Sequence, residues 1–160
     1  MKEFKNKVAF ITGSAHGFGK AIAQKAASLG MKLVLVDQDE EALNKVTDEL
    51  SKTTEVLKIV ADVTEENNIY DAVDKAMDQF GEIDLLVNDA GVAVPGPIWE
   101  LPTRDWEWIL HADLMSQVYA LRKVIPIMMK QENGGDILNV ASAAGLLTAP
   151  GMPAYYATKF

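Results

Sequence analysis

The 160-residue sequence contains no cysteine. This absence excludes disulfide bonds, a thiolate nucleophile and a zinc site built on thiolates. It is compatible with the reducing cytoplasm, which is the location we expect. The sequence also has no run of about 20 apolar residues, so we expect no membrane-spanning segment. Its first residues lack the apolar core of a signal peptide.

Positive charge is scarce as well. Lysine and arginine together number 15 against 23 acidic residues, which gives a formal net charge of −8. An acidic chain repels the phosphate backbone, so we expect no nucleic-acid partner. The remaining composition, 49% hydrophobic and 24% charged, is typical of a globular protein. A chain of this length predicts one domain over residues 1–160.

Short apolar segments alternate with amphipathic ones along the chain. We expect strands at residues 7–12, 32–37, 55–62, 83–89 and 135–142, and helices at residues 19–30, 39–52, 64–81 and 103–131. Thr64 and Asn67 weakly match a capping box at the start of the third helix. Near-continuous apolar strands separated by helices predict an α/β fold. This is a doubly wound, Rossmann-type, mainly parallel sheet with helices on both faces.

A glycine-rich turn, in the segment ITGSAHGFGKAIA, joins the first expected strand to the first helix. Its spacing, G-x-x-x-G-x-G, differs from the general G-x-G-x-x-G dinucleotide fingerprint but shares its physics. Glycines allow close approach of the backbone, and the following helix N-terminus offers free N–H groups to a pyrophosphate. The alternative is that the turn is merely tight. The candidate cofactor contacts in this turn are Gly13, Ser14, His16, Gly17, Phe18 and Gly19.

An acidic residue, Asp37, ends the second expected strand, 20 residues after Gly17. A carboxylate there accepts hydrogen bonds from the ribose hydroxyls of NAD and repels the 2′-phosphate of NADP, so we favour NAD over NADP. The alternative is that Asp37 only caps the following helix. His16 would favour a phosphate if it were protonated, and otherwise it is a loop residue that faces solvent.

Further motifs follow the glycine turn in a fixed order, and together they resemble the short-chain dehydrogenase/reductase family over the entire chain. TGSAHGFG is similar to that family's T-G-x-x-x-G-x-G loop, NDAG to its N-N-A-G motif, and YYATKF contains its Y-x-x-x-K pair. The resemblance implies an NAD(P)-dependent oxidoreductase that interconverts a small-molecule alcohol and carbonyl. The further cofactor contacts that it implies are Asp62, Val63, Asn88, Ala90, Gly91, Tyr155 and Lys159.

The same resemblance implies a catalytic role for Ser142, Tyr155 and Lys159. Tyrosine has an ordinary pKa of about 10, so it needs a neighbouring cation to act as a base at neutral pH. The four-residue offset places the lysine and the tyrosine on one helix face, and the serine would orient the substrate oxygen. The alternatives are that the serine caps a strand end, the tyrosine packs, and the lysine is solvated. The adjacent Tyr156 fits neither spacing.

Two acids stand where the family has asparagines. Asp89 replaces the second asparagine of N-N-A-G, and it cannot donate a hydrogen bond when ionised. Asp113 replaces the asparagine of the N-x-x-G segment and is a fourth candidate catalytic residue. An anionic Asp113 near Lys159 would weaken the lysine's field and slow proton transfer. The alternative is that Asp113 is protonated or points elsewhere.

The expected sheet has fewer strands than the full dinucleotide fold, which has six. Five are visible in the sequence, so we expect a C-terminally truncated chain with an incomplete second half. Apolar residues of the fifth strand, Ile137, Leu138 and Val140, should then be exposed, and homo-oligomers are possible. This leaves two alternatives to an active enzyme, namely a cofactor-binding remnant without turnover and an interaction module.

Overall fold

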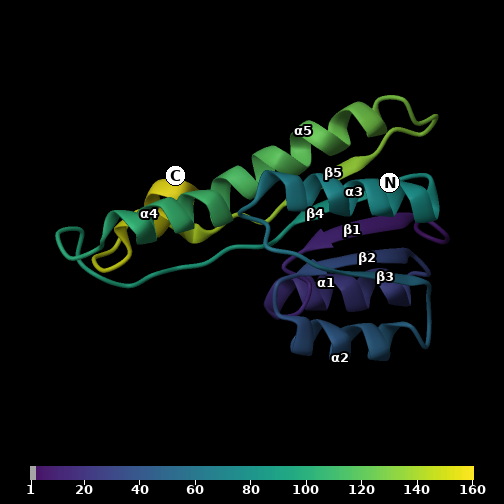
Figure 1. Cartoon of the computed structure of the whole chain (residues 1–160), viewed down its shortest axis with the longest axis horizontal. Helices are drawn as coiled ribbons and strands as arrows, with labels where there is room; N and C mark the ends of the chain where they lie inside the picture. Colours follow the sequence, from purple (N-terminus) through teal and green to yellow (C-terminus); the bar gives the residue numbers. More distant parts are fainter. Residues whose placement is uncertain (1–2) are drawn as a thin grey trace.

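The computed structural model describes residues 3–160, and it shows a parallel sheet of five strands (Figure 1). The strand order is β3-β2-β1-β4-β5, and every neighbouring pair is parallel. This confirms the predicted doubly wound fold, whose strand order 3-2-1-4-5-6 the sheet follows through the fifth strand. The strands are β1 (Val8–Thr12), β2 (Lys32–Asp37), β3 (Val56–Val60), β4 (Leu85–Asn88) and β5 (Asp136–Asn139).

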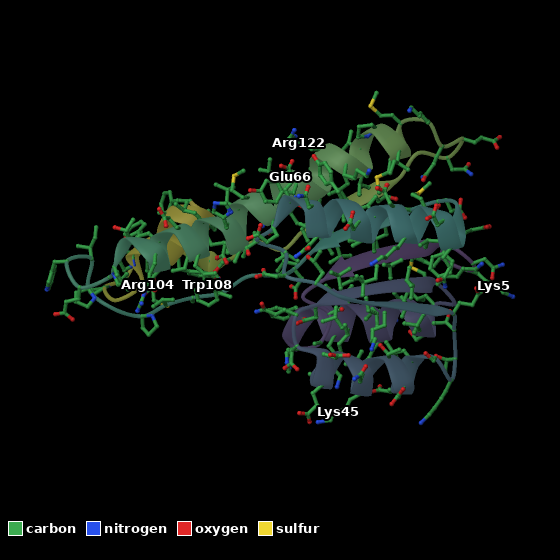
Figure 2. The ribbon with its side chains drawn as sticks, in the orientation of Figure 1. Lys5, Lys45, Glu66, Arg104, Trp108 and Arg122 are labelled. Carbon is green, nitrogen blue, oxygen red and sulfur yellow. The ribbon has the colours of Figure 1, made fainter. Side chains whose placement is uncertain are left out.

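Helices cover both faces of the sheet, as the apolar strands predicted. In Figure 1, α1 and α2 lie on one side of the strands and α3 and α5 on the other. Arg122 of α5 and Glu66 of α3 form an ion pair of 2.8 Å on the second side (Figure 2). The bounds are α1 (Gly17–Ser28), α2 (Glu40–Leu50), α3 (Glu66–Phe80), α4 (Thr103–Leu110), α5 (Ser116–Met128) and α6 (Pro153–Lys159).

Two apolar cores hold these layers together. The first packs α1 and α2 against the sheet through side chains such as Ile11, Leu35 and Leu43. The second packs α3 and α5 against the other face and includes Phe10 and Ile69. Successive residues of β1 therefore serve opposite cores, which explains why the strand is buried throughout.

The chain changes direction across the sheet at β1. The strands β2 and β3 are added on one side of β1, whereas β4 and β5 are added on the other. In an open α/β sheet, such a reversal leaves a crevice outside the carboxyl ends of the strands. Thr12 and Asn88, which end β1 and β4, are directly paired at this point. Residues that follow either strand therefore face the crevice.

The expected long helix is divided into three parts. Between α4 and α5 lies a π-helical turn, η1 (His111–Met115), so the helical path continues while its register changes. The α4 end projects beyond the sheet, where the C-terminal α6 lies beside it (Figure 1). Such π-bulges occur often at functional sites, and this one contains Asp113.

Two expected helix starts need correction. The first helix begins at Gly17, so its first turn includes part of the glycine motif. The third begins at Glu66 with Glu65 at its N-cap and without a side-chain cap. The predicted capping box at Thr64 is wrong because that hydroxyl donates to the carboxylate of Asp62 at 2.8 Å instead.

The fifth strand is exposed, as the sequence predicted. Ile137 and Leu138 are 40% and 44% exposed, respectively, while Val140 is partly buried against the α1–α2 core. Within the described chain, β5 pairs only with β4 and forms an edge of the sheet. No helix within residues 3–160 is both long and apolar enough to cross a membrane.

Candidate functional site

The glycine turn packs closely against the loop that follows β4. Gly13 has a φ of +68°, and a Cβ there would lie 2.8 Å from the backbone nitrogen of Ala90. A Cβ on Gly19 would overlap the carbonyl oxygen of Gly13. Any larger residue at either position would therefore displace backbone, so the turn needs its glycines.

The N-terminus of α1 is the positive end of a helix dipole and points into the crevice. Its N-cap residue, His16, makes no side-chain cap, and the first turn of α1 holds no acid of its own. Instead, the backbone N–H of Gly19 donates to a carboxylate oxygen (Oδ2) of Asp89 at 2.6 Å. The helix is therefore capped by an acid from a different part of the chain.

Asp37 lies at the carboxyl end of β2 and faces the same crevice. One of its oxygens accepts from the N–H of Ala15 at 2.9 Å, and the other accepts from the N–H of Asp39 at 3.0 Å. The cap of α2 is Asp39, whose side chain accepts from Ala42. The alternative that Asp37 serves only as the cap of α2 is therefore wrong.

The first cavity, of about 430 Å³, lies between the glycine turn and the ends of β2, β3 and β4. Four carboxylates line it, and none of its lining residues within the described chain is a lysine or an arginine. His16 lines it too, at 2.9 Å from Asp39 and largely exposed, as the alternative for this residue predicted. The predicted cofactor contacts along it are Gly13, His16, Gly17, Asp37, Asp62, Val63, Ala90 and Gly91.

The second cavity, of about 500 Å³, adjoins the first and is lined by three of the four predicted catalytic residues, Ser142, Tyr155 and Lys159, whereas Asp113 does not line it. The two cavities share three lining residues, Asp89, Gly91 and Val92. Tyr155 and the glycine turn therefore line adjoining cavities. The other members of the second cavity include Phe18, Ser142, Tyr155 and Lys159.

Tyr155 and Lys159 share one face of α6. The lysine nitrogen (Nζ) lies 5.5 Å from the centre of the Tyr155 ring. Tyr156 does not line either cavity within the described chain. Ser142 lies in the loop after β5 and lines the second cavity. Its side chain accepts from the N–H of Ala144 at 3.1 Å and so caps the short turn η2 (Ala143–Gly145).

Asp113 is buried beneath Lys159. One carboxylate oxygen accepts from the N–H of Val92 at 2.7 Å. The other accepts from the hydroxyl of Thr158 at 3.2 Å and lies 3.7 Å from the Lys159 nitrogen. The alternative that Asp113 points elsewhere is therefore wrong. Its side chain ties the loop after β4 to α6.

Asp89 lies between the two cavities and is partly buried. Burial raises the pKa of its carboxyl, and the negative charge of Asp37 raises it further. The hydrogen bond from Gly19 and the positive charge of Lys159 act in the opposite direction, but the net pKa shift is upward. Burial thus favours the neutral form of the Asp89 carboxyl by raising its pKa above the ordinary value.

Three predicted cofactor contacts, Ser14, Gly19 and Asn88, line neither cavity. The backbone N–H of Gly19 is already bonded to Asp89. Ser14 is fully buried, and its hydroxyl donates to the carbonyl of Val36 in β2. Asn88 is buried too, and its amide donates to Asn139 at 2.8 Å. The side chains of Ser14 and Asn88 are each hydrogen-bonded to a neighbouring strand, so both stabilise the sheet near the ends of β1 and β4.

The structure also adds residues that the sequence did not indicate. Trp108 projects from α4, lines the first cavity and is 42% exposed (Figure 2). Val92 and Thr158 hold the carboxylate of Asp113. In the sequence, the only indication of these contacts was Asp113 itself, a polar residue on an otherwise buried helix face.

Within the described residues, no group of three or more acidic or histidine side chains is placed to hold a metal.

Comparison with known proteins identifies the family. The family model for short chain dehydrogenases matches residues 7–160. The chain belongs to this family of oxidoreductases.

The chain is 63% identical over 161 aligned positions to a "CLA biosynthesis dehydrogenase/reductase" of Lactiplantibacillus plantarum, covering all of this chain and 56% of that protein. A short-chain dehydrogenase/reductase from Burkholderia phymatum, solved with NAD, is 44% identical with a TM-score of 0.96. The alignment covers 99% of this chain and 57% of that one. L-sorbose reductase from Gluconobacter frateurii, solved with NADPH and L-sorbose, is 31% identical with a TM-score of 0.93. The coverage there is 98% and 60%. The chain thus spans somewhat over half the length of these relatives.

Proposed function

We propose that this chain carries the cofactor site and the proton-transfer residues of an oxidoreductase that interconverts an alcohol and a carbonyl with NAD. The observation that carries the proposal is the junction of the two cavities. The glycine turn opens on one, Tyr155 lines the other, and both share Asp89, Gly91 and Val92. A dinucleotide is long enough to extend from a diphosphate site into a neighbouring reaction site.

The residues of the first cavity fit the adenosine diphosphate half of such a cofactor. The close contacts at Gly13 and Gly19 keep side chains away from the N-terminus of α1, so a diphosphate can approach backbone N–H groups. The carboxylate of Asp37 lines the cavity and suits ribose hydroxyls. It would repel an added 2′-phosphate, which supports NAD over NADP.

The residues of the second cavity fit a proton-transfer centre. The bound nicotinamide would supply or accept the hydride. Tyr155 would take the proton from an alcohol oxygen, or return it to a carbonyl oxygen. The nitrogen of Lys159, 5.5 Å from the ring centre, would stabilise the negative charge that develops on the phenol oxygen during proton transfer. Ser142 would donate a hydrogen bond to the same substrate oxygen. The name of the 63% identical relative, a dehydrogenase/reductase, supports this class of reaction.

A direct test measures binding and turnover separately. NAD and NADP are titrated into the purified protein by calorimetry, and reduction of the nicotinamide is followed by absorbance with a panel of primary and secondary alcohols. We expect NAD to bind more tightly than NADP and at least one alcohol class to be oxidised. Binding without turnover would instead support a cofactor-binding remnant. If neither dinucleotide binds at millimolar concentration, the proposal is wrong.

A further inference from the structure

The carboxylate of Asp89 occupies the place where an anionic ligand would be most strongly attracted. It accepts the N–H of Gly19, which lies in the first turn of α1. A helix N-terminus carries about half a positive charge, and this charge attracts phosphates. In this protein, the carboxylate of Asp89 already interacts with the positive end of α1. A diphosphate entering the glycine turn would therefore meet a negative charge at its binding site.

The surrounding groups do little to compensate for this charge. From β2 and the loop after it come Asp37 and Asp39, and from the end of β3 comes Asp62. The basic side chains that face the site are His16, which lies against Asp39, and Lys159 of α6, which pairs with Asp113 of η1. Each of these side chains thus has an acid as a neighbour, and the diphosphate would bring further negative charge into this group.

We propose that Asp89 limits the affinity of this site for a diphosphate, and that the site binds a diphosphate most tightly when Asp89 is neutral. The inference deepens the proposed function and rests on it. Asp89 is a positioning residue for the helix N-terminus and a determinant of ligand affinity. Binding would then raise the pKa of Asp89 further and draw a proton from solvent onto it over the pH range in which that carboxyl titrates, because the neutral carboxyl still accepts the N–H of Gly19 without opposing the ligand's charge.

Two ligands separate the charge effect from other effects. ADP-ribose carries the diphosphate without nicotinamide, and adenosine carries the same base and one ribose without phosphate. The variant Asp89→Asn removes the charge and keeps an oxygen for the N–H of Gly19. The control Asp71→Asn removes one charge from an exposed position on α3, remote from the cavities. Thermal melting checks that both variants fold.

We expect Asp89→Asn to bind ADP-ribose on the order of tenfold more tightly than wild type at about pH 8, with adenosine binding and the Asp71→Asn control unchanged. The ratio between variant and wild type should fall toward one as the pH is lowered through the range in which Asp89 becomes protonated. Taking the ratio of the two affinities at each pH cancels the effect of His16 and of the carboxyl groups other than Asp89, because both proteins contain these groups. In the wild type alone, ADP-ribose affinity should rise over this range relative to adenosine affinity, a readout that needs no variant.

Equal affinity of the variant and wild type for ADP-ribose at all pH values would overturn the inference, and so would an equal change in adenosine binding. In both cases the proposed function would stand, since the ligand still binds. If ADP-ribose and NAD bind to neither protein, the proposed function itself fails.

Discussion

The ammonium group of Lys159 lies 3.7 Å from the carboxylate of Asp113, and both side chains are almost completely buried. A buried carboxylate is tolerated only when its oxygens are satisfied, and Val92 and Thr158 donate to those of Asp113. The π-helical turn places Asp113 at this point. The pair therefore fixes the lysine under Tyr155 while partly offsetting its charge.

Replacing Asp113 with asparagine should increase the rate of proton transfer. The neutral amide keeps an acceptor for Val92 but no longer offsets the lysine, whose field would favour the phenolate more strongly. We expect the rise of kcat with pH to begin at lower pH in Asp113→Asn than in the wild type. An unchanged pH–rate profile would show that Asp113 serves packing alone.

Replacing Asp113 with alanine should instead destabilise the fold. It leaves the lysine charge and the N–H of Val92 without their partner, while the hydroxyl of Thr158 keeps the carbonyl of Tyr155 as an acceptor at 2.8 Å. The loss costs about 3 kcal/mol of unfolding free energy or more. Urea denaturation of Asp113→Ala and Asp113→Asn measures the difference. The asparagine variant, which retains one acceptor, should lose clearly less; similar losses would argue against this role of the hydrogen bonds.

The two adjacent tyrosines provide a matched pair for the chemistry. Tyr155→Phe should lower kcat by roughly a hundredfold to ten-thousandfold, because the group that exchanges the proton is lost. Tyr156→Phe should leave kcat within about twofold of the wild type, since Tyr156 lines neither cavity in the described chain. NAD affinity, measured by calorimetry, should be similar in both variants. The reverse pattern would transfer the role to Tyr156.

The glycine turn should tolerate no side chain at Gly19. A Cβ there overlaps the Gly13 carbonyl and lies 2.8 Å from the Asp89 carboxylate, so Gly19→Ala should cost about 1–3 kcal/mol and abolish dinucleotide binding. Gly81→Ala is the control. That glycine ends α3 at a φ of +76° with open space around it, so alanine should cost about 1 kcal/mol without affecting binding. Dinucleotide binding that survives Gly19→Ala would place the diphosphate elsewhere.

Cofactor preference should depend on the charge of Asp37. In Asp37→Asn the repulsion of a 2′-phosphate is removed, so the ratio of NADP to NAD affinity should rise by about tenfold. Asp39→Asn removes a neighbouring carboxylate from the same cavity and keeps a good N-cap for α2. It should change the ratio much less. Calorimetric titration of NAD and NADP measures this ratio in both variants. An equal change in Asp37→Asn and Asp39→Asn would mean that cofactor preference depends only on the total charge of the cavity.

The sheet could be predicted from the sequence because its signals are local. The segments around Ile11 and Leu35 are short, apolar and β-branched, and each is followed by an amphipathic helix. The crevice could be predicted from the same alternation of strands and helices, since the residues that follow parallel strands meet at one edge of the sheet. Asp37 and Gly13 could therefore be assigned to one site before any coordinates were known.

The remainder of the site depends on contacts between distant segments. The π-helical register at Asp113 has no local signature, because it arises where the helix meets Val92 and Thr158. Ser14 and Asn88 belong to motifs whose other residues line the cavities, and only strand pairing shows that their own side chains join strands. The cap on α1 from Asp89 crosses 70 residues of sequence.

The most direct test of the account measures backbone amide chemical shifts by NMR while NAD is added. If one dinucleotide extends through both cavities, the amides of Gly17 and Gly19 and those of Tyr155 and Lys159 should shift together with one apparent dissociation constant. Adenosine should shift amides near Asp37 while leaving α6 unchanged. Shifts confined to one cavity, or none at the glycine turn, would contradict the account.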